Sequence, residues 1–221
     1  MNGHHPFLKA LGLNVLAWLA FLALVLAFYF VWLRDFQMNW GATPEEVDQY
    51  MVGDELRNNP DFNATRAVEV KATPEQIWPW LVQMGYGRAG FYGFDRLDNG
   101  GMASAERILP EWQGLKVGDS IPCAEYEGRP FYFLEIVEME PNRSMLWVFT
   151  ATPWKGATWS WALYPTVNHT TRLVSRLRHE YTVRSVHDVF AIAVIDVSEI
   201  MMMRTTLLGI KRRAERDARN R

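Results

Sequence analysis

The feature that most constrains the fold of this chain is a run of 24 residues without a charged side chain, residues 10–33. Asn14 is its one strongly polar residue. As an α-helix the run is about 36 Å long, enough to cross a hydrocarbon core of about 30 Å with some tilt. Aromatic side chains gather at its far end, as in the interfacial belt of a membrane helix: Phe28, Tyr29, Phe30 and Trp32. The sequence therefore predicts a single-pass transmembrane anchor over residues 1–34.

A cleaved signal peptide is the alternative for this segment. The apolar part of a signal peptide is about 7–15 residues long and precedes a small-x-small cleavage site, whereas this run is longer and no such site follows it. One basic residue flanks each end of the apolar run, Lys9 before it and Arg34 after it, but the stretch beyond residue 44 is acidic. We expect a single-pass protein of the bacterial inner (cytoplasmic) membrane, with the domain on the periplasmic, outer face.

Composition excludes several classes of protein. The chain is 49% hydrophobic and 22% charged, so it can bury enough apolar surface to fold and is not intrinsically disordered. Its formal net charge of −2 argues against a nucleic-acid partner, because such proteins need a concentrated basic surface. The one cysteine, Cys123, excludes an intramolecular disulfide framework. The ten Trp, twelve Phe and eight Tyr suggest that part of the chain surrounds something apolar.

The pattern of the chain changes twice after the anchor. Residues 35–62 are predicted to be a connector with one short helix, because residues 43–46 read Thr-Pro-Glu-Glu, a capping box with proline at the first helical position. Alternation over residues 66–71 predicts a strand, and a second capping signature at residues 73–76 starts a helix that Gly85 ends. Further strands are expected at residues 119–121, 131–140, 144–150, 158–164 and 171–181, and a long amphipathic helix at 186–218.

This order of elements predicts an α+β fold. Consecutive strands joined by short turns form an antiparallel sheet, and helices that lie together on one face of it complete the domain. A curved sheet around one long C-terminal helix would leave a cavity between them. We therefore expect a helix-grip domain over residues 63–221, preceded by one transmembrane helix.

Several segments carry a resemblance to a known superfamily. They are residues 40–47, 53–56, 64–70, 77–85, 88–92, 117–119, 171–176 and 207–215. In this order they resemble bacterial members of the SRPBCC superfamily, the START, birch-pollen-allergen and polyketide-cyclase-like helix-grip proteins. The resemblance covers residues 40–215 and leaves the anchor outside. It implies a fold but no single activity, because the superfamily includes lipid carriers, cyclases and ring-hydroxylase subunits.

Motifs for common chemistries do not fit their context. Residues 85–90 satisfy G-x-G-x-x-G, but they follow a helix rather than a strand, so no dinucleotide cofactor is predicted. The histidines lack the short spacing of a paired metal ligand set, and Cys123 has no histidine beside it in sequence. Asp95 and Asp98 are interpreted as capping residues of a solvated loop rather than as a cation site. We predict no cofactor, no metal and no catalytic residues.

Two groups of side chains are the candidates for ligand binding. The first lies in the loop after the helix that starts at residue 74: Tyr86, Arg88, Tyr92 and Asp95. Polar groups beside an apolar cavity fix the orientation of small molecules, although an Arg88–Asp95 ion pair that only holds the loop is the structural alternative. The second group lies on the helix and strands that would face the cavity or solvent: Trp78, Trp147, Trp159 and Arg178.

Three functions are compatible with these patterns. The preferred hypothesis is a membrane-anchored helix-grip protein that binds an apolar small molecule or lipid without chemistry of its own. The second is an accessory subunit of a larger membrane complex, respiratory or photosynthetic, because a lone span with Asn14 and Trp18 can pack against other subunits. The third is a cyclase or dehydrase in which Arg88 and Asp95 polarise a carbonyl and move a proton.

Overall fold

A six-stranded antiparallel sheet forms the centre of the domain. The computed structural model describes residues 6–126, 129–151, 154–181 and 183–220. The strand order is β1-β6-β5-β4-β3-β2. The first and last strands of the chain therefore pair with each other, and β1 and β2 are the two edge strands. The strands are β1 (Phe62–Val70), β2 (Ser120–Tyr126), β3 (Arg129–Glu140), β4 (Ser144–Phe149), β5 (Thr158–Pro165) and β6 (Thr171–His179).

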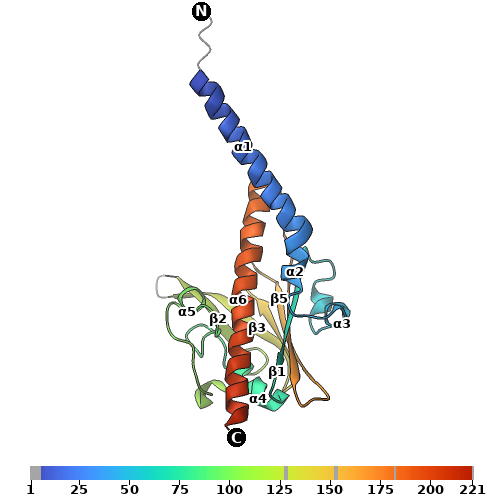
Figure 1. Ribbon diagram of the computed structural model, residues 1–221. Helices are drawn as coiled ribbons and strands as arrows, with labels where there is room; N and C mark the ends of the chain where they lie inside the picture. Colours follow the sequence, from blue (N-terminus) through green and yellow to red (C-terminus); the bar gives the residue numbers. More distant parts are fainter. Residues whose placement is uncertain (1–5, 127–128, 152–153, 182, 221) are drawn as a thin grey trace, which may run out of the picture.

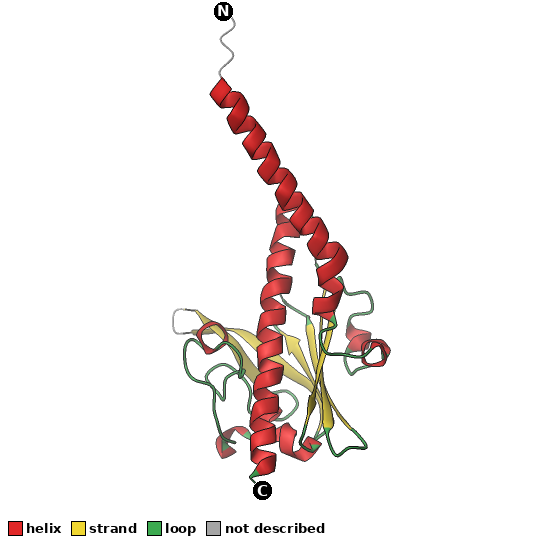
Figure 2. Cartoon of the chain, viewed as in Figure 1, coloured by secondary structure: helices red, strands yellow, loops and turns green. Residues whose placement is uncertain are grey.

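One long helix, α6 (Val186–Arg219), lies across the curved sheet (Figure 1). It begins at a capping box in which Ser185 and Asp188 exchange hydrogen bonds. Figure 2 shows how this helix and the sheet form two layers. The predicted α+β, helix-grip architecture is confirmed.

Shorter helices start where the capping signals predicted them. Thr43 caps α3 (Pro44–Asp48) and Thr73 caps α4 (Pro74–Val82). The loop between α4 and β2 contains the short helix α5 (Asp95–Asp98), which the sequence did not predict. Single 3-10 turns occupy Asp54–Leu56 and Pro110–Trp112.

Aromatic side chains fill the core between the sheet and the helices. Trp80 of α4 and Trp147 and Trp161 of the sheet are completely buried. Trp147 pairs with Trp159 across β4 and β5, and their rings meet edge to face at 5.1 Å between centroids. The aromatic surplus of the composition is thus partly a packing requirement of this domain.

The N-terminal helix projects away from the sheet (Figure 1). It consists of α1 (Pro6–Phe28), a π-helical turn (Tyr29–Leu33) and α2 (Arg34–Met38), which follow one another without a break. The stretch Ala10–Met38 is long and apolar enough to span a membrane. One face of its last ten residues contacts the rest of the protein, because Tyr29 and Met38 are buried there, whereas Trp32 and Phe36 are exposed. The division of the chain at residues 34 and 62 stays a prediction.

A buried carboxylate joins this helix to α6. Asp196 is completely buried, and it accepts hydrogen bonds from Arg34 Nε at 2.8 Å, Tyr29 Oη at 3.1 Å and Tyr181 Oη at 3.0 Å. The π-helical turn makes this possible: the N–H of Arg34 bonds to the C=O of Tyr29, five residues back, so the two side chains share one face. Glu199, one turn further along α6, forms an ion pair with Arg66 of β1.

Arg34→Met should destabilise the domain. The Arg34 side chain is 22% exposed, and its removal leaves the buried Asp196 with two hydroxyl donors and no cation. We expect the free energy of unfolding to fall by about 2 kcal/mol, measured by denaturant unfolding of the full chain in a neutral detergent. Arg143→Met is the matched control, because Arg143 pairs with Glu140 at the exposed surface and its loss should change stability by less than about 0.5 kcal/mol. Equal losses for the two variants would show that the Asp196 contact contributes nothing special.

Candidate functional site

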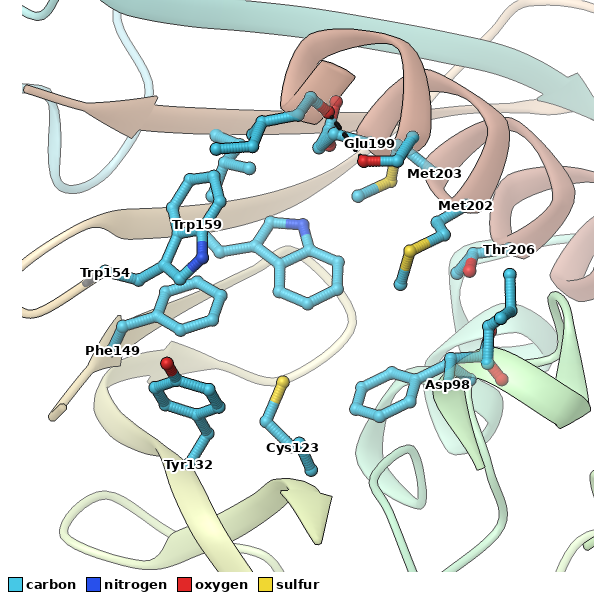
Figure 3. Close-up of a pocket in the computed structure, with 16 residues that line it drawn as sticks. Asp98, Cys123, Tyr132, Phe149, Trp154, Trp159, Glu199, Met202, Met203 and Thr206 are labelled. Carbon is cyan, nitrogen blue, oxygen red and sulfur yellow. Dashed lines mark hydrogen bonds between the residues drawn. The ribbon is translucent and has the colours of Figure 1, made fainter. Parts of the chain in front are cut away.

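A cavity of about 370 Å³ lies between the sheet and α6. This volume is within the range of small-molecule sites, about 300–1,000 Å³. Sixteen residues line it (Figure 3): Phe91, Leu97, Asp98, Cys123, Ala124, Tyr132, Phe149, Trp154, Trp159, Leu177, Ile195, Ser198, Glu199, Met202, Met203 and Thr206. Most of them are apolar or aromatic, which makes the cavity suited to an apolar molecule.

One face of α6 forms a wall of the cavity. Its six lining residues follow one another at intervals of three and one, which places them along a single stripe of the helix. Met202 and Met203 belong to this stripe. Because thioether side chains adapt their shape, they can pack against ligands of different outline.

Aromatic rings form the opposite wall. Phe149 and Trp159 stack at 6.3 Å between centroids with planes 9° apart, and Trp154 lies 6.0 Å from Phe149. Figure 3 shows Trp154, Phe149 and Tyr132 on one side of the cavity and Asp98 and Thr206 on the other. The cavity therefore has an aromatic side and a polar side.

Two ionisable groups of the cavity carry no unbalanced charge: Glu199 is ion-paired and the Cys123 thiol is protonated. Burial raises the pKa of Glu199, and the guanidinium of Arg66 opposes this shift through their ion pair. Burial also raises the pKa of the Cys123 thiol to about 12, with the charge of Asp98 as the second cause. At neutral pH this thiol stays protonated, so it is a poor nucleophile.

Asp98 of α5 is the carboxyl group of the cavity that has no charged partner of opposite sign among the described residues. It is 6% exposed, and neither carboxylate oxygen receives a hydrogen bond of ordinary geometry from the described residues. Burial, and then the charge of Asp95, raise its pKa to about 6. The expected solvated capping residue is thus a buried carboxyl on the wall of the cavity. Sequence reasoning missed its role because nothing local distinguishes it from Asp95.

Asp95 has the structural role in this loop. Its carboxylate accepts hydrogen bonds from Ser104 N at 3.0 Å and Ser104 Oγ at 2.5 Å, and Ser104 Oγ in turn accepts one from Tyr92 N. Tyr92 is buried with a φ of 62°, and its hydroxyl donates to Trp80 O at 2.9 Å. Both residues hold the loop in place, and neither is among the residues that line the described cavity.

The remaining predicted residues lie in several places. Arg88 stacks on Trp112 at 4.6 Å and donates to the carbonyls of Val82 and Trp112, so it does not form the ion pair with Asp95 that the sequence suggested as an alternative. Arg178 pairs with Asp54 at 2.9 Å on the far face of the sheet. Three others take part in the core or the loop: Trp78, Tyr86 and Trp147.

Trp159 is the member of the predicted set that lines the cavity. Its indole N–H donates to Ser175 Oγ at 2.8 Å, which fixes the ring as part of the aromatic wall. In the part of the chain that the structure describes, no group of three or more His, Cys, Asp and Glu side chains could hold a metal ion.

Comparison with known proteins yields similar folds. No family model and no curated protein matches the chain. CalC from Micromonospora echinospora, a self-sacrificing resistance protein, is 11% identical over 70% of this chain and 95% of its own, with a TM-score of 0.47. The polyketide-cyclase-like protein Cgl2372 from Corynebacterium glutamicum is 15% identical over 72% of this chain and 94% of its own, with a TM-score of 0.42.

A third similar structure is larger. DynU16, from the dynemicin biosynthetic locus, is 17% identical over 67% of this chain with a TM-score of 0.42, and the match spans 46% of DynU16. Of these three proteins, Cgl2372 is described as polyketide-cyclase-like. At such identities the likeness concerns the arrangement of sheet and helix alone.

Asp98→Asn should stabilise the protein at pH 7.5. A carboxyl with a raised pKa in the folded state holds its proton more tightly there than in the unfolded chain, where its pKa is about 3.9. Asp98 therefore lowers stability progressively as pH rises from about 4 to about 6, and the full penalty persists above that. We expect the variant to gain on the order of 1–2 kcal/mol in unfolding free energy at pH 7.5 and less at pH 5.

Asp95→Asn is the contrasting variant in the same helix. Because Asp95 accepts two hydrogen bonds from Ser104, its replacement should lower the free energy of unfolding by about 1 kcal/mol at pH 7.5. If both variants lost stability to the same extent, Asp98 would have a partner that its geometry does not indicate.

Proposed function

We propose that this chain is a membrane-anchored helix-grip protein whose cavity binds an apolar small molecule or lipid, without a reaction of its own. The observation that carries the proposal is the cavity itself, walled by aromatic rings on one side and on the other by a face of α6 that places Ile195, Met202 and Met203 beside polar groups. A cavity of this kind favours molecules that leave water readily.

The length of the N-terminal helix supports a location at the bilayer. Ala10–Met38 has 29 residues and is about 44 Å long as a helix, whereas a hydrocarbon core is about 30 Å thick. The excess corresponds to about ten residues, the length of the stretch from Tyr29 to Met38, in which Tyr29 and Met38 are buried against the domain. We infer that the helix leaves the hydrocarbon near Phe28.

This placement brings the cavity close to the membrane surface. Asp196 contacts Tyr29, the first residue beyond the inferred span, and its neighbour Ile195 already lines the cavity. Exposed apolar side chains continue along the free side of the same part of α6: Phe190, Val194, Val197 and Met201. An apolar molecule dissolved in the bilayer would thus be concentrated next to its binding site.

The polar groups of the cavity argue against chemistry at this site. Glu199 is held by Arg66, the Cys123 thiol is protonated, and Asp98 has no base or nucleophile bonded to it among the described residues. Nucleophilic and acid–base catalysis both need groups within hydrogen-bond reach of one another. Arg88 and Asp95, the pair on which a cyclase or dehydrase would depend, are each engaged elsewhere.

A cavity-filling variant tests the binding function. Ala124 of β2 lines the cavity, so Ala124→Trp should occupy much of its volume. Native mass spectrometry of the full chain, released from neutral detergent, should show a noncovalently bound molecule on the parent protein and none on this variant. Val137→Trp, at an exposed position of β3, is the matched control and should keep the ligand. The proposal would be contradicted if the parent protein showed only the mass of the bare chain, even after incubation with a membrane lipid extract.

A C-terminal alkaline phosphatase fusion tests the anchor and its orientation in a bacterial host. We propose that the acidic domain lies on the periplasmic side of the inner membrane, so the fusion to the full chain should be active and sediment with membranes. Deletion of residues 1–26 keeps Tyr29 and Arg34 but removes the span, and should give an inactive fusion in the soluble fraction. An inactive full-length fusion in the membrane would reverse the proposed orientation, and a soluble one would refute the anchor.

A further inference from the structure

The buried carboxylate of Asp98 has no hydrogen-bond or ion-pair partner of ordinary geometry among the described residues, and it lines the cavity. We propose that the molecule bound in this cavity carries a protonated amine, which Asp98 binds on the side opposite the aromatic wall. The inference rests on the proposed binding function and names the class of ligand that this site prefers.

Burial of a charge is costly unless an opposite charge or hydrogen-bond donors compensate it. The nearby cations of the chain are committed to other groups. Arg66 pairs with Glu199, Arg88 donates to two backbone carbonyls, and Arg213 donates to Ala105 O and pairs with Glu106. None of these three guanidinium groups is bonded to Asp98, so its charge is available to a cation that enters the cavity.

Two threonine hydroxyl oxygens of α6 lie close to the Asp98 carboxylate. A Cβ on Gly93 would be 2.6 Å from Asp98 Oδ2, 3.0 Å from Thr205 Oγ1 and 3.2 Å from Thr206 Oγ1, so the three oxygens surround one small region beside the glycine. An ammonium group has three donors and no acceptor, which suits such a set of oxygens. Thr206 and Asp98 lie together on the same side of the cavity in Figure 3.

The rest of the cavity suits the apolar part of the same molecule. Phe149, Trp154 and Trp159 present ring faces and edges across the space from Asp98 (Figure 3). The two charged side chains that line the cavity, Asp98 and Glu199, are both carboxylates, and Glu199 is paired with Arg66. This field favours a cationic ligand over a fatty acid of the same length.

Three probes of matched shape test the inference: 4-phenylbutylamine, 4-phenylbutan-1-ol and 4-phenylbutyrate. Their binding to the full chain in a neutral detergent is measured by isothermal titration calorimetry at pH 7.5. We expect the amine to bind at least about tenfold more tightly than the alcohol, because its hydrogen bond is charge-assisted, and the acid to bind most weakly. Asp98→Asn should abolish the advantage of the amine and change the affinity for the alcohol less than about twofold. Glu138→Gln, which removes an exposed carboxylate of β3, should behave as the parent protein.

The pH dependence provides a second readout. As pH falls through about 6, Asp98 takes up a proton and the affinity for the amine should decrease, whereas the affinity for the alcohol should not. The other titratable groups around Asp98 are Asp95, bound to Ser104, and three side chains of the surrounding elements: Cys123, Tyr132 and Glu199. Loss of the pH dependence in Asp98→Asn assigns it to Asp98 rather than to any of these.

The outcomes separate this inference from the proposed function. Equal affinities of the parent protein for the three probes, or an amine preference that survives in Asp98→Asn, would overturn the inference and leave the cavity as an apolar binding site. If none of the probes binds and Ala124→Trp also leaves the mass spectrum unchanged, the proposed function itself fails.

Discussion

The architecture depends on a single buried carboxylate, that of Asp196, which connects two helices far apart in the sequence. A fully buried charge tolerates few arrangements of its neighbours, because each lost partner leaves it uncompensated. Tyr29 and Arg34 must therefore reach it from the N-terminal helix while Tyr181 reaches it from the end of the sheet. This requirement fixes the rotation of the apolar helix relative to α6, and the π-helical turn is the local distortion that satisfies it. The adjacent Arg66–Glu199 pair extends the same connection to the wall of the cavity.

Most of the fold could be predicted because its signals are local. Alternation and capping patterns are contained within a few residues, and they located the strands from residue 131 onwards and both capped helices. For β2 they gave residues 119–121, whereas the strand runs over Ser120–Tyr126. The predicted strand at residues 66–71 was too short at its start, because β1 extends to Phe62 through pairing with His179 of β6, a contact that no local pattern records. The π-helical turn was also unpredictable, since its reason lies at Asp196, more than 160 residues away.

The candidate site was harder to predict than the fold for the same reason. Asp95 and Asp98 are three residues apart in one turn of helix, and the sequence offers no ground to prefer either. Their difference arises from Ser104, which bonds to Asp95, and from the side chains of β2 and α6 that enclose Asp98. Arg178 lies on the face of the sheet away from the cavity, with Asp54, because side chains on alternate positions of β6 point to opposite faces. The face of a strand that meets a helix is decided by tertiary packing.

Two sets of contacts, one in each half of the helix, hold α6 in place. Near its C-terminal end, Arg213 lies 4.6 Å over the ring of Tyr92, and a Cβ on Gly209 would collide with the carbonyl of the same tyrosine, so backbone meets backbone there. Asp196 secures the other half. The opposite boundary is less regular: β2 is an edge strand that pairs with β3, its Pro122 O accepts a hydrogen bond from Tyr86 N, and its register shifts on both sides of Ala124. The cavity thus lies between a helix held by buried contacts and a strand with an irregular ladder, so a molecule that binds there as proposed is expected to displace β2 rather than α6 or the apolar helix joined to it through Asp196.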